Sequence, residues 1–166
     1  MFRFLIGGLA LFMVSVFITP DVMADPLDDQ AKEYAQNVSG KQKIMLQALI
    51  LQGRMISTLY AKQGEGDDDP DFIKAQERMN EYLDEIGFED EIRAILPENP
   101  SSELVGLSNV LAGCVTALRN SEDILETPSE GVDRVKNSEN LWQFSRYYFT
   151  EFSDQLEKIS GVPKPE

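Results

Sequence analysis

Histidine is missing from this 166-residue sequence, and cysteine occurs once, at Cys114. Without histidine the chain cannot build Ser-His-Asp or Cys-His catalytic groups, the usual zinc sites or a histidine-ligated haem. A single cysteine also excludes an intrachain disulfide, and no C-x-x-C-H haem-attachment motif is present. We therefore expect a protein that is not an enzyme, with no catalytic residues, no metal site and no cofactor.

Basic residues are scarce. The sequence has 15 lysines and arginines against 29 aspartates and glutamates, which gives a formal net charge of −14. A field of this sign repels nucleic acids and anionic lipid surfaces. We therefore expect no nucleic-acid partner.

The first 24 residues have the composition of a signal peptide. Arg3 supplies a positive charge, the run "FLIGGLALFMVSVFI" supplies an apolar core, and "VMA" before Asp25 supplies small residues for cleavage. The apolar run is shorter than the roughly 20 residues of a membrane-spanning helix. We predict cleavage between Ala24 and Asp25, a periplasmic location and one domain over residues 25–166; an uncleaved N-terminal anchor is the alternative.

Four dipeptides predict helix starts, because each pairs an N-capping side chain with proline at the first helical position. They are Asp25-Pro26, Asp69-Pro70, Asn99-Pro100 and Thr127-Pro128. Apolar residues between these points recur at steps of three and four, which is typical of helices. The third segment has the most regular series: Leu104, Leu107, Leu111, Cys114, Leu118 and Leu125, with Ser121 in the one gap. The second series loses phase at Gly87, where we expect a break or kink.

Amphipathic helices joined by short loops can bury their apolar faces only against one another. We therefore predict an all-α fold, an up-down-up-down four-helix bundle behind the signal peptide. The first helix is the longest, up to about 38 residues, or ~57 Å at 1.5 Å per residue. It should outreach its neighbours or bend near Ser39-Gly40.

The first helix contains a segment without acidic residues, residues 34–64, although the chain is strongly acidic. Lys43, Gln47, Ile50 and Arg54 follow one another at spacings of four, three and four, so they share one face. The same helix is apolar on nearly every side, which is typical of a helix buried on more than one side.

A second copy of the protein is the simplest cover for the outer side of this helix. We expect a homodimer in which Leu46, Ile50 and Gly53 face outward and the cations of the two chains converge. Converging cations in a partly dry groove are costly unless an anion joins them, which suggests a small-anion site. The alternative is that Lys43, Gln47 and Arg54 form a solvated outer face and nothing more.

The stretch "SGKQKIMLQAL" resembles the G-[RK]-Q-[RK]-M-L-S-Q-R-M signature of the type IV pilus methyl-accepting chemotaxis transducer N-terminal domain. That domain is similar to the periplasmic sensor of nitrate/nitrite-responsive histidine kinases. Gly40, Lys41, Gln42, Lys43 and Gln47 match the motif. The sequence differs at Leu46 and Ala48, where the family usually has serine and arginine.

The resemblance implies a helical periplasmic sensor in which the residue at the position of Lys43 contacts an anion at a dimer interface. Our candidate ligand-binding residues are Lys43, Gln47, Arg54, Lys41 and Gln42. Lys41 lies on the inward side of the predicted helix and is the alternative carrier of the charge.

Two other features have structural interpretations. The stretch "WQFSRYYFTEF", residues 142–152, packs six aromatic residues into 11 positions, and its spacing favours core packing, with some rings left to line a groove. The acidic "GDDDPD", residues 66–71, lacks the glycine and the glutamate of an EF-hand loop. We interpret it as a loop with an N-cap, with weak calcium binding as the alternative.

These observations predict a non-enzymatic periplasmic module that senses or binds a ligand, a small anion near Lys43 or a membrane receptor. The alternative is a structural or chaperone-like periplasmic interaction protein that uses the apolar sides of the first and last helices.

Overall fold

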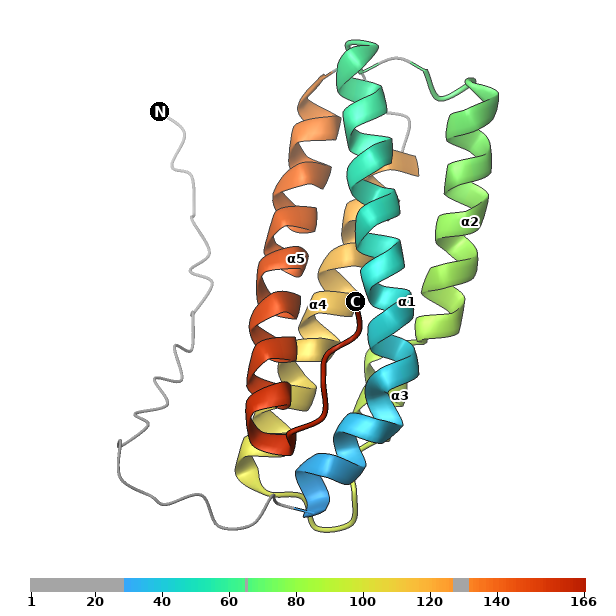
Figure 1. Cartoon of the computed structure of the whole chain (residues 1–166). Helices are drawn as coiled ribbons and strands as arrows, with labels where there is room; N and C mark the ends of the chain where they lie inside the picture. The colour runs from blue at the N-terminus through green and yellow to red at the C-terminus, as the bar shows by residue number, and fades with distance from the viewer. Residues whose placement is uncertain (1–28, 65, 127–131) are drawn as a thin grey trace, which may run out of the picture.

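The computed structural model describes residues 29–64, 66–126 and 132–166. These residues form five helices and no strand: α1 (Asp29–Ala61), α2 (Pro70–Ile86), α3 (Glu89–Arg93), α4 (Ser102–Glu126) and α5 (Val132–Ser160) (Figure 1). The prediction of an all-α fold is confirmed. The predicted signal peptide and the predicted caps at Asp25-Pro26 and Thr127-Pro128 lie outside the described residues.

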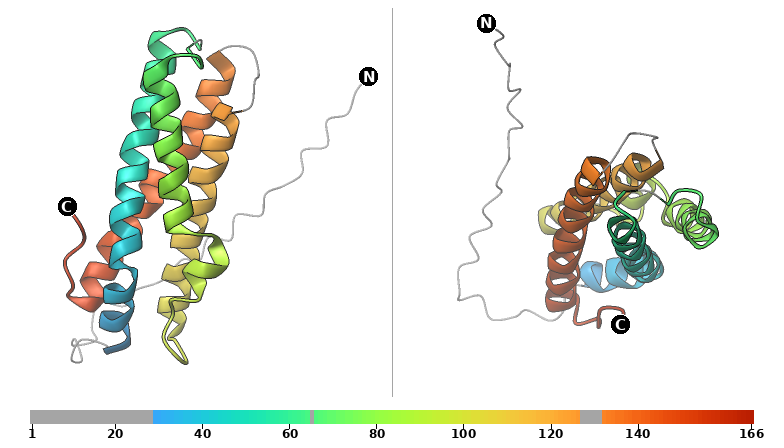
Figure 2. Two further views of the ribbon diagram at one scale, coloured as in Figure 1. Left: turned by 90° about the vertical axis from the view of Figure 1, so that its right-hand side faces the viewer. Right: turned by 90° about the horizontal axis from the view of Figure 1, so that it is seen from above.

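The four long helices pack side by side in a bundle-like arrangement (Figures 1 and 2). α4 packs against α5, and α1 packs against both α5 and α2. In Figure 1 the first turns of α1, drawn in blue, lean away from the axis of its later turns. Because α1 contacts α2 on one side and α5 on another, its outer side lies between these two contacts.

Two of the four predicted helix starts, at Asp69 and at Asn99, lie within the described residues, and the structure confirms only the first. At Asp69 the prediction is confirmed, because its Oδ1 accepts a hydrogen bond from Asp71 N at 2.8 Å and Pro70 opens α2. At Asn99 the prediction is wrong. Asn99 has a φ of 53°, outside the extended region of an N-cap, and Ser101 Oγ accepts instead from Leu104 N at 3.2 Å.

The predicted break at Gly87 is confirmed. α2 ends at Ile86, and Gly87 has a φ of 82°, which a residue without a Cβ adopts easily. The chain then restarts as α3, a fifth helix that the four-helix prediction did not include.

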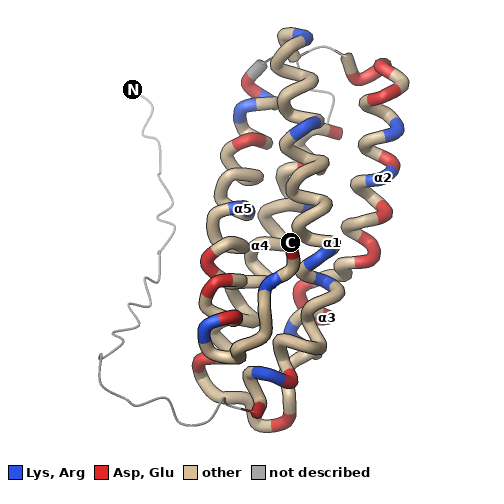
Figure 3. Tube along the Cα trace, viewed as in Figure 1, with Lys and Arg blue, Asp and Glu red and all other residues tan. Residues whose placement is uncertain are grey.

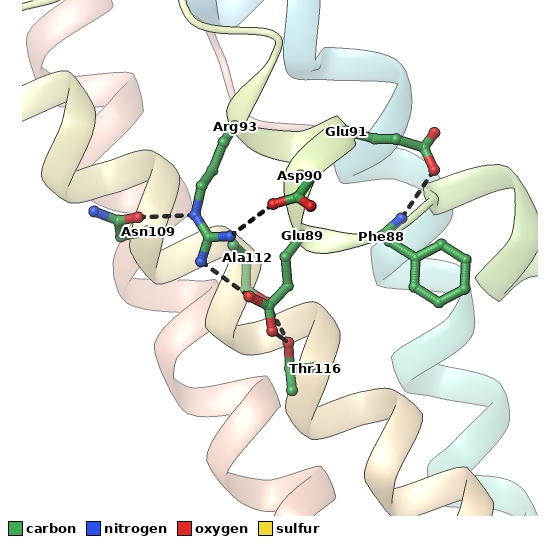
Figure 4. Close-up of polar contacts among 8 residues, drawn as sticks. All are labelled: Phe88, Glu89, Asp90, Glu91, Arg93, Asn109, Ala112 and Thr116. Carbon is green, nitrogen blue, oxygen red and sulfur yellow. Dashed lines mark hydrogen bonds and ion pairs between the residues drawn. The ribbon is translucent and has the colours of Figure 1, made fainter.

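α3 has only five residues, so side-chain contacts with α4 must hold it in place. The Glu89 carboxylate accepts hydrogen bonds from Thr116 Oγ1 and from Arg93 Nη2, the latter at 2.9 Å (Figure 4). The Thr116 hydroxyl, followed by Arg93, holds the pKa of Glu89 below its usual value. Arg93 Nε also donates to Asn109 Oδ1 at 3.1 Å, and these contacts fix α3 against α4.

The predicted seam of α4 is confirmed throughout, since all of its members are buried: Leu104, Leu107, Leu111, Cys114, Leu118, Ser121 and Leu125. Hydroxyl groups at the contact with α5 are satisfied locally. Ser145 Oγ donates to the carbonyl oxygen of Cys114 at 2.8 Å, and Ser138 Oγ donates to that of Ser121 at 2.8 Å. Small serine side chains at this contact let α4 and α5 approach closely.

Cys114→Ser is expected to lower the free energy of unfolding by about 1–3 kcal/mol, because it buries a hydroxyl among leucines. Burial raises the pKa of the Cys114 thiol to about 12, so the native protein should react very slowly with thiol reagents. Urea unfolding monitored by circular dichroism measures the first effect, and labelling of the folded protein measures the second. Labelling as fast as that of the unfolded chain contradicts the buried assignment.

Candidate functional site

Three of the five predicted ligand-binding residues share the outer face of α1. Lys43, Gln47 and Arg54 are exposed there, together with Ile50, which is 50% exposed. We call these four residues the outer stripe. Figure 3 shows α1 free of acidic positions along this stretch, whereas α2 and α5 carry several. In the part of the chain that the structure describes, the side chains of Lys43, Gln47 and Arg54 have no hydrogen bond or ion pair.

The spacing of the outer stripe limits what it can bind. Lys43 and Arg54 are 11 residues apart in sequence, which is roughly 16 Å along a helix at 1.5 Å per residue. A small anion spans a few ångströms, so it can contact both side chains of one chain only if they extend toward each other along the helix. Otherwise each cation takes a separate anionic group, or a second chain brings a cation close to each of them.

The other two predicted residues, Lys41 and Gln42, lie elsewhere. Lys41 Nζ donates to the carbonyl oxygens of Ile86 at 2.5 Å and Glu85 at 3.4 Å, at the C-terminal end of α2. A cation is favourable at that end of a helix. Gln42 is 4% exposed, and its Nε2 donates to Ser153 Oγ on α5 at 3.4 Å. Both residues hold helices together, and neither lies beside Lys43 on the outer face.

The prediction that Leu46 and Gly53 face outward is wrong. The Trp142 ring covers Gly53, where an added Cβ would lie 2.7 Å from Trp142 Cζ2. Trp142 Nε1 also donates to the carbonyl oxygen of Leu49 at 2.7 Å. Leu46 packs against the core and shares a pocket with Phe149 of α5 and Pro165 of the C-terminal segment. The chain itself therefore covers most of the side of α1 that we assigned to a second copy.

The C-terminal segment extends this cover beyond α5. It folds back from the end of α5 toward α1 (Figure 1). Lys164 pairs with Asp154, and the partly buried Val162 packs against the core. Ile50 is the one member of the predicted apolar contact that is still exposed.

An open groove of about 410 Å³ lies on α5. Its lining residues are Trp142, Gln143, Arg146, Tyr147, Thr150 and Glu151. The Arg146 guanidinium lies 5.5 Å from the centroid of the Trp142 ring. Since Gly53 contacts Trp142 and Leu46 shares a pocket with Thr150, residues 47–50 are level with residues 145–149 of α5. We call the outer stripe and this groove together the α1–α5 face.

The aromatic stretch of α5 divides between the core and the surface. Core packing is confirmed for Phe149 and Phe152, which are 5% and 1% exposed. Three rings are exposed instead and contact one another: the centroids of Phe144 and Tyr148 are 4.5 Å apart, and those of Tyr147 and Tyr148 are 5.1 Å apart. These rings form an exposed aromatic cluster, part of which borders the groove.

Arg134 is a buried residue that the sequence patterns did not identify. It is 5% exposed and donates to both carboxylate oxygens of Asp67, at 2.7 and 2.9 Å. It also donates to the carbonyl oxygens of Leu125 and Gly64, each at 3.2 Å. Asp69, in the same acidic loop, pairs with Lys62. Two aspartates of "GDDDPD" therefore have structural partners, in agreement with the interpretation as a loop with an N-cap.

Glu122 is a second buried residue without a sequence signal. It is 2% exposed, and burial, together with the neighbouring Glu126 and Asp123, raises its pKa to about 8. It lies on the side of α4 that faces α2, away from the α1–α5 face. The apolar pattern of α4 does not mark it, because its neighbour Ser121 occupies the seam position.

No family model matches the sequence, and no curated protein and no solved structure matches it either. Within the described ranges, no helix combines the length and the apolar character that crossing a membrane requires. The α1–α5 face is therefore the basis on which we propose a function.

Proposed function

We propose that this protein is a non-enzymatic periplasmic module that senses or binds a ligand, and that it receives an anionic group on the α1–α5 face. The observation that carries the proposal is the outer stripe. Lys43, Gln47 and Arg54 are exposed without a side-chain partner among the described residues, on a helix segment without acids, in a chain of net charge −14. Arg146 adds a third cation at the level of Ile50.

Keeping carboxylates off this segment has a physical consequence. A nearby carboxylate would compete with a ligand for the same cations, most strongly where the local dielectric constant is reduced. Several basic side chains elsewhere, although not all of them, have such partners: Arg93 pairs with Glu89, Arg134 with Asp67 and Lys164 with Asp154. Glu151 is the carboxylate among the lining residues of the groove, so the anion should bind on the α1 side of it.

An up-down-up-down bundle and a periplasmic location are part of the same proposal. The opposite directions of consecutive long helices in Figures 1 and 2 support an up-down-up-down bundle. The resemblance to chemotaxis and nitrate-sensor domains supports export behind a signal peptide and docking on a membrane receptor. The partner of the α1–α5 face is then a small anion or an acidic group of that receptor.

Dimerisation through α1 resolves the spacing problem of the outer stripe. If two copies of α1 cross in opposite directions between Gln47 and Ile50, Lys43 of each chain comes close to Arg54 of the other. Each pair of cations could then share one anion. Because the chain's own residues cover Leu46 and Gly53, Ile50 is the apolar centre of this contact.

Ile50→Glu is expected to convert the dimer to a monomer, since it places a carboxylate from each chain at the centre of the contact. Light scattering at micromolar concentration measures the mass. Ile73→Glu is the matched control, because Ile73 is 42% exposed on α2 and lies outside the contact. A wild-type protein that is already monomeric at this concentration excludes the dimer.

Lys43→Ala is expected to weaken binding of a responsive anion by about 10-fold or more, because a charged hydrogen bond contributes about 1.5–3 kcal/mol. A thermal-shift screen with nitrate, nitrite and small carboxylates identifies the responsive anion, and calorimetry measures its affinity. Lys41→Ala is the comparison variant. It should lower the melting temperature, because Lys41 binds the carbonyl oxygens of α2, but leave the affinity unchanged. Unchanged affinity in both variants would reduce the outer stripe to a solvated face.

The second candidate is a structural or chaperone-like interaction protein that uses the apolar sides of α1 and α5. The exposed aromatic cluster favours it, because Phe144 and Tyr147 are 49% and 60% exposed. Aromatic side chains of this kind are enriched at protein interfaces. A chain that responds to no anion in the thermal-shift screen supports this second function over the first.

A further inference from the structure

Three carboxylates converge near the C-terminal end of α4. Glu122, Asp123 and Glu126 each offer one oxygen, and these oxygens all lie within 4.8 Å of one another. α4 ends at Glu126, and its last turn contains no basic residue. The negative end of the helix dipole therefore adds to the repulsion among the three groups.

Glu122 sets this cluster apart from an ordinary acidic surface. It is 2% exposed, and its Oε1 is a buried atom with no hydrogen-bond partner among the described residues. A buried carboxylate oxygen without a donor costs the fold its desolvation energy. An unpaired oxygen beside two other carboxylates offers a ligand position for a positively charged group.

Among the described residues, no Lys or Arg side chain forms an ion pair with Glu122 or Glu126. Asn80 Nδ2 of α2 donates to Glu126 Oε1 at 3.2 Å, but an amide is neutral. The guanidinium of Arg134 reaches the carbonyl oxygen of Leu125, and its ion pair is with Asp67.

We propose that Glu122, Asp123 and Glu126 bind one hard divalent cation of the Ca²⁺ class. Ca²⁺ binds oxygen ligands at about 2.3–2.6 Å, so oxygens separated by up to 4.8 Å can surround one ion. Carboxylates without histidine or cysteine favour Ca²⁺ or Mg²⁺ over softer metals. Water is available for the remaining positions. The ion neutralises the repulsion and fastens the end of α4, independently of the α1–α5 face.

The test is calcium binding by the full chain after treatment with EDTA. Calorimetry should give one ion per chain, and Ca²⁺ should raise the melting temperature above that in NaCl of equal ionic strength. Glu126→Gln and Glu122→Gln should each weaken the binding by 10-fold or more. Glu103→Gln, an exposed position in the first turn of α4, should leave it unchanged.

Each variant is compared with itself in Ca²⁺ and in EDTA, because Glu122→Gln also replaces a buried titratable carboxyl group and can change the melting temperature without any metal. Glu126 is exposed, so its variant tests the site without that complication. The absence of saturable binding at millimolar Ca²⁺ overturns the proposal. An equal Ca²⁺ response in Glu126→Gln and Glu103→Gln also overturns it, since the response would then be general charge screening.

Discussion

Arg134→Met is expected to lower the free energy of unfolding by about 3 kcal/mol, the largest loss we predict for a single polar side chain. The guanidinium is buried and joins three parts of the chain: Asp67 and Gly64 between α1 and α2, Leu125 near the end of α4, and α5 itself. Methionine fills a similar volume but donates nothing. The carbonyl oxygens of Gly64 and Leu125 then lose their donor, and unpaired buried polar groups cost about 1–3 kcal/mol each.

Urea unfolding followed by circular dichroism measures this loss. Arg78→Met is the matched control, because Arg78 pairs with Glu81 on the surface, where both side chains are more than half exposed. The control should change stability by about 0.5 kcal/mol or less. Asp67→Asn should lie between the two, since Arg134 keeps both carbonyl acceptors. Equal stability of the Arg134 and Arg78 variants contradicts the role assigned to Arg134.

Trp142→Ala is expected to cost about 3 kcal/mol, near the lower end for removing a packed aromatic side chain, because Trp142 is only partly buried. The ring covers Gly53, and its Nε1 hydrogen bond to Leu49 joins α5 to α1. Trp142→Phe keeps most of the ring and loses the donor, so it should cost about 1 kcal/mol.

Gly53→Val changes the α1 side of the same contact. Its Cβ would lie 2.7 Å from Trp142 Cζ2, so the ring must shift or α1 and α5 must separate. Tyr147→Ala, on the same helix but 60% exposed, is the control for loss of an aromatic side chain. If Trp142→Ala is no less stable than Tyr147→Ala, the contact of Trp142 with α1 does not hold the two helices together.

The sequence patterns predicted the helices better than the site. The seam of α4 and the break at Gly87 follow from local periodicity and from the backbone freedom of glycine, so both could be predicted from a single segment. The start of α4 could not, because Asn99 and Ser101 are both good caps, and Ser101 makes the hydrogen bond that decides between them.

The errors at α1 arise from contacts between residues far apart in the sequence. Gly53 and Leu46 look exposed on a helical projection of α1 alone, but Trp142 and Pro165 lie about 90 to 120 residues later and cover them. Lys41 and Gln42 are adjacent, so a rotation of about 100° decides which of them turns inward. α2 ends beside Lys41, and α5 presents Ser153 to Gln42. Nothing in α1 itself encodes either contact.

We propose that Lys43 and Arg54 form a specific anion-binding face rather than part of the general charge of the protein. Calorimetry on two double variants of equal net charge tests it most directly. Lys43→Ala/Arg54→Ala and Lys74→Ala/Lys136→Ala each remove two exposed cations, which changes the net charge from −14 to −16. With the anion that shifts the wild-type melting temperature most, we predict that the first variant loses affinity by 10-fold or more and the second keeps it. Equal loss of affinity in the two variants would show that only the net charge matters, and it would contradict a specific anion-binding face at Lys43 and Arg54.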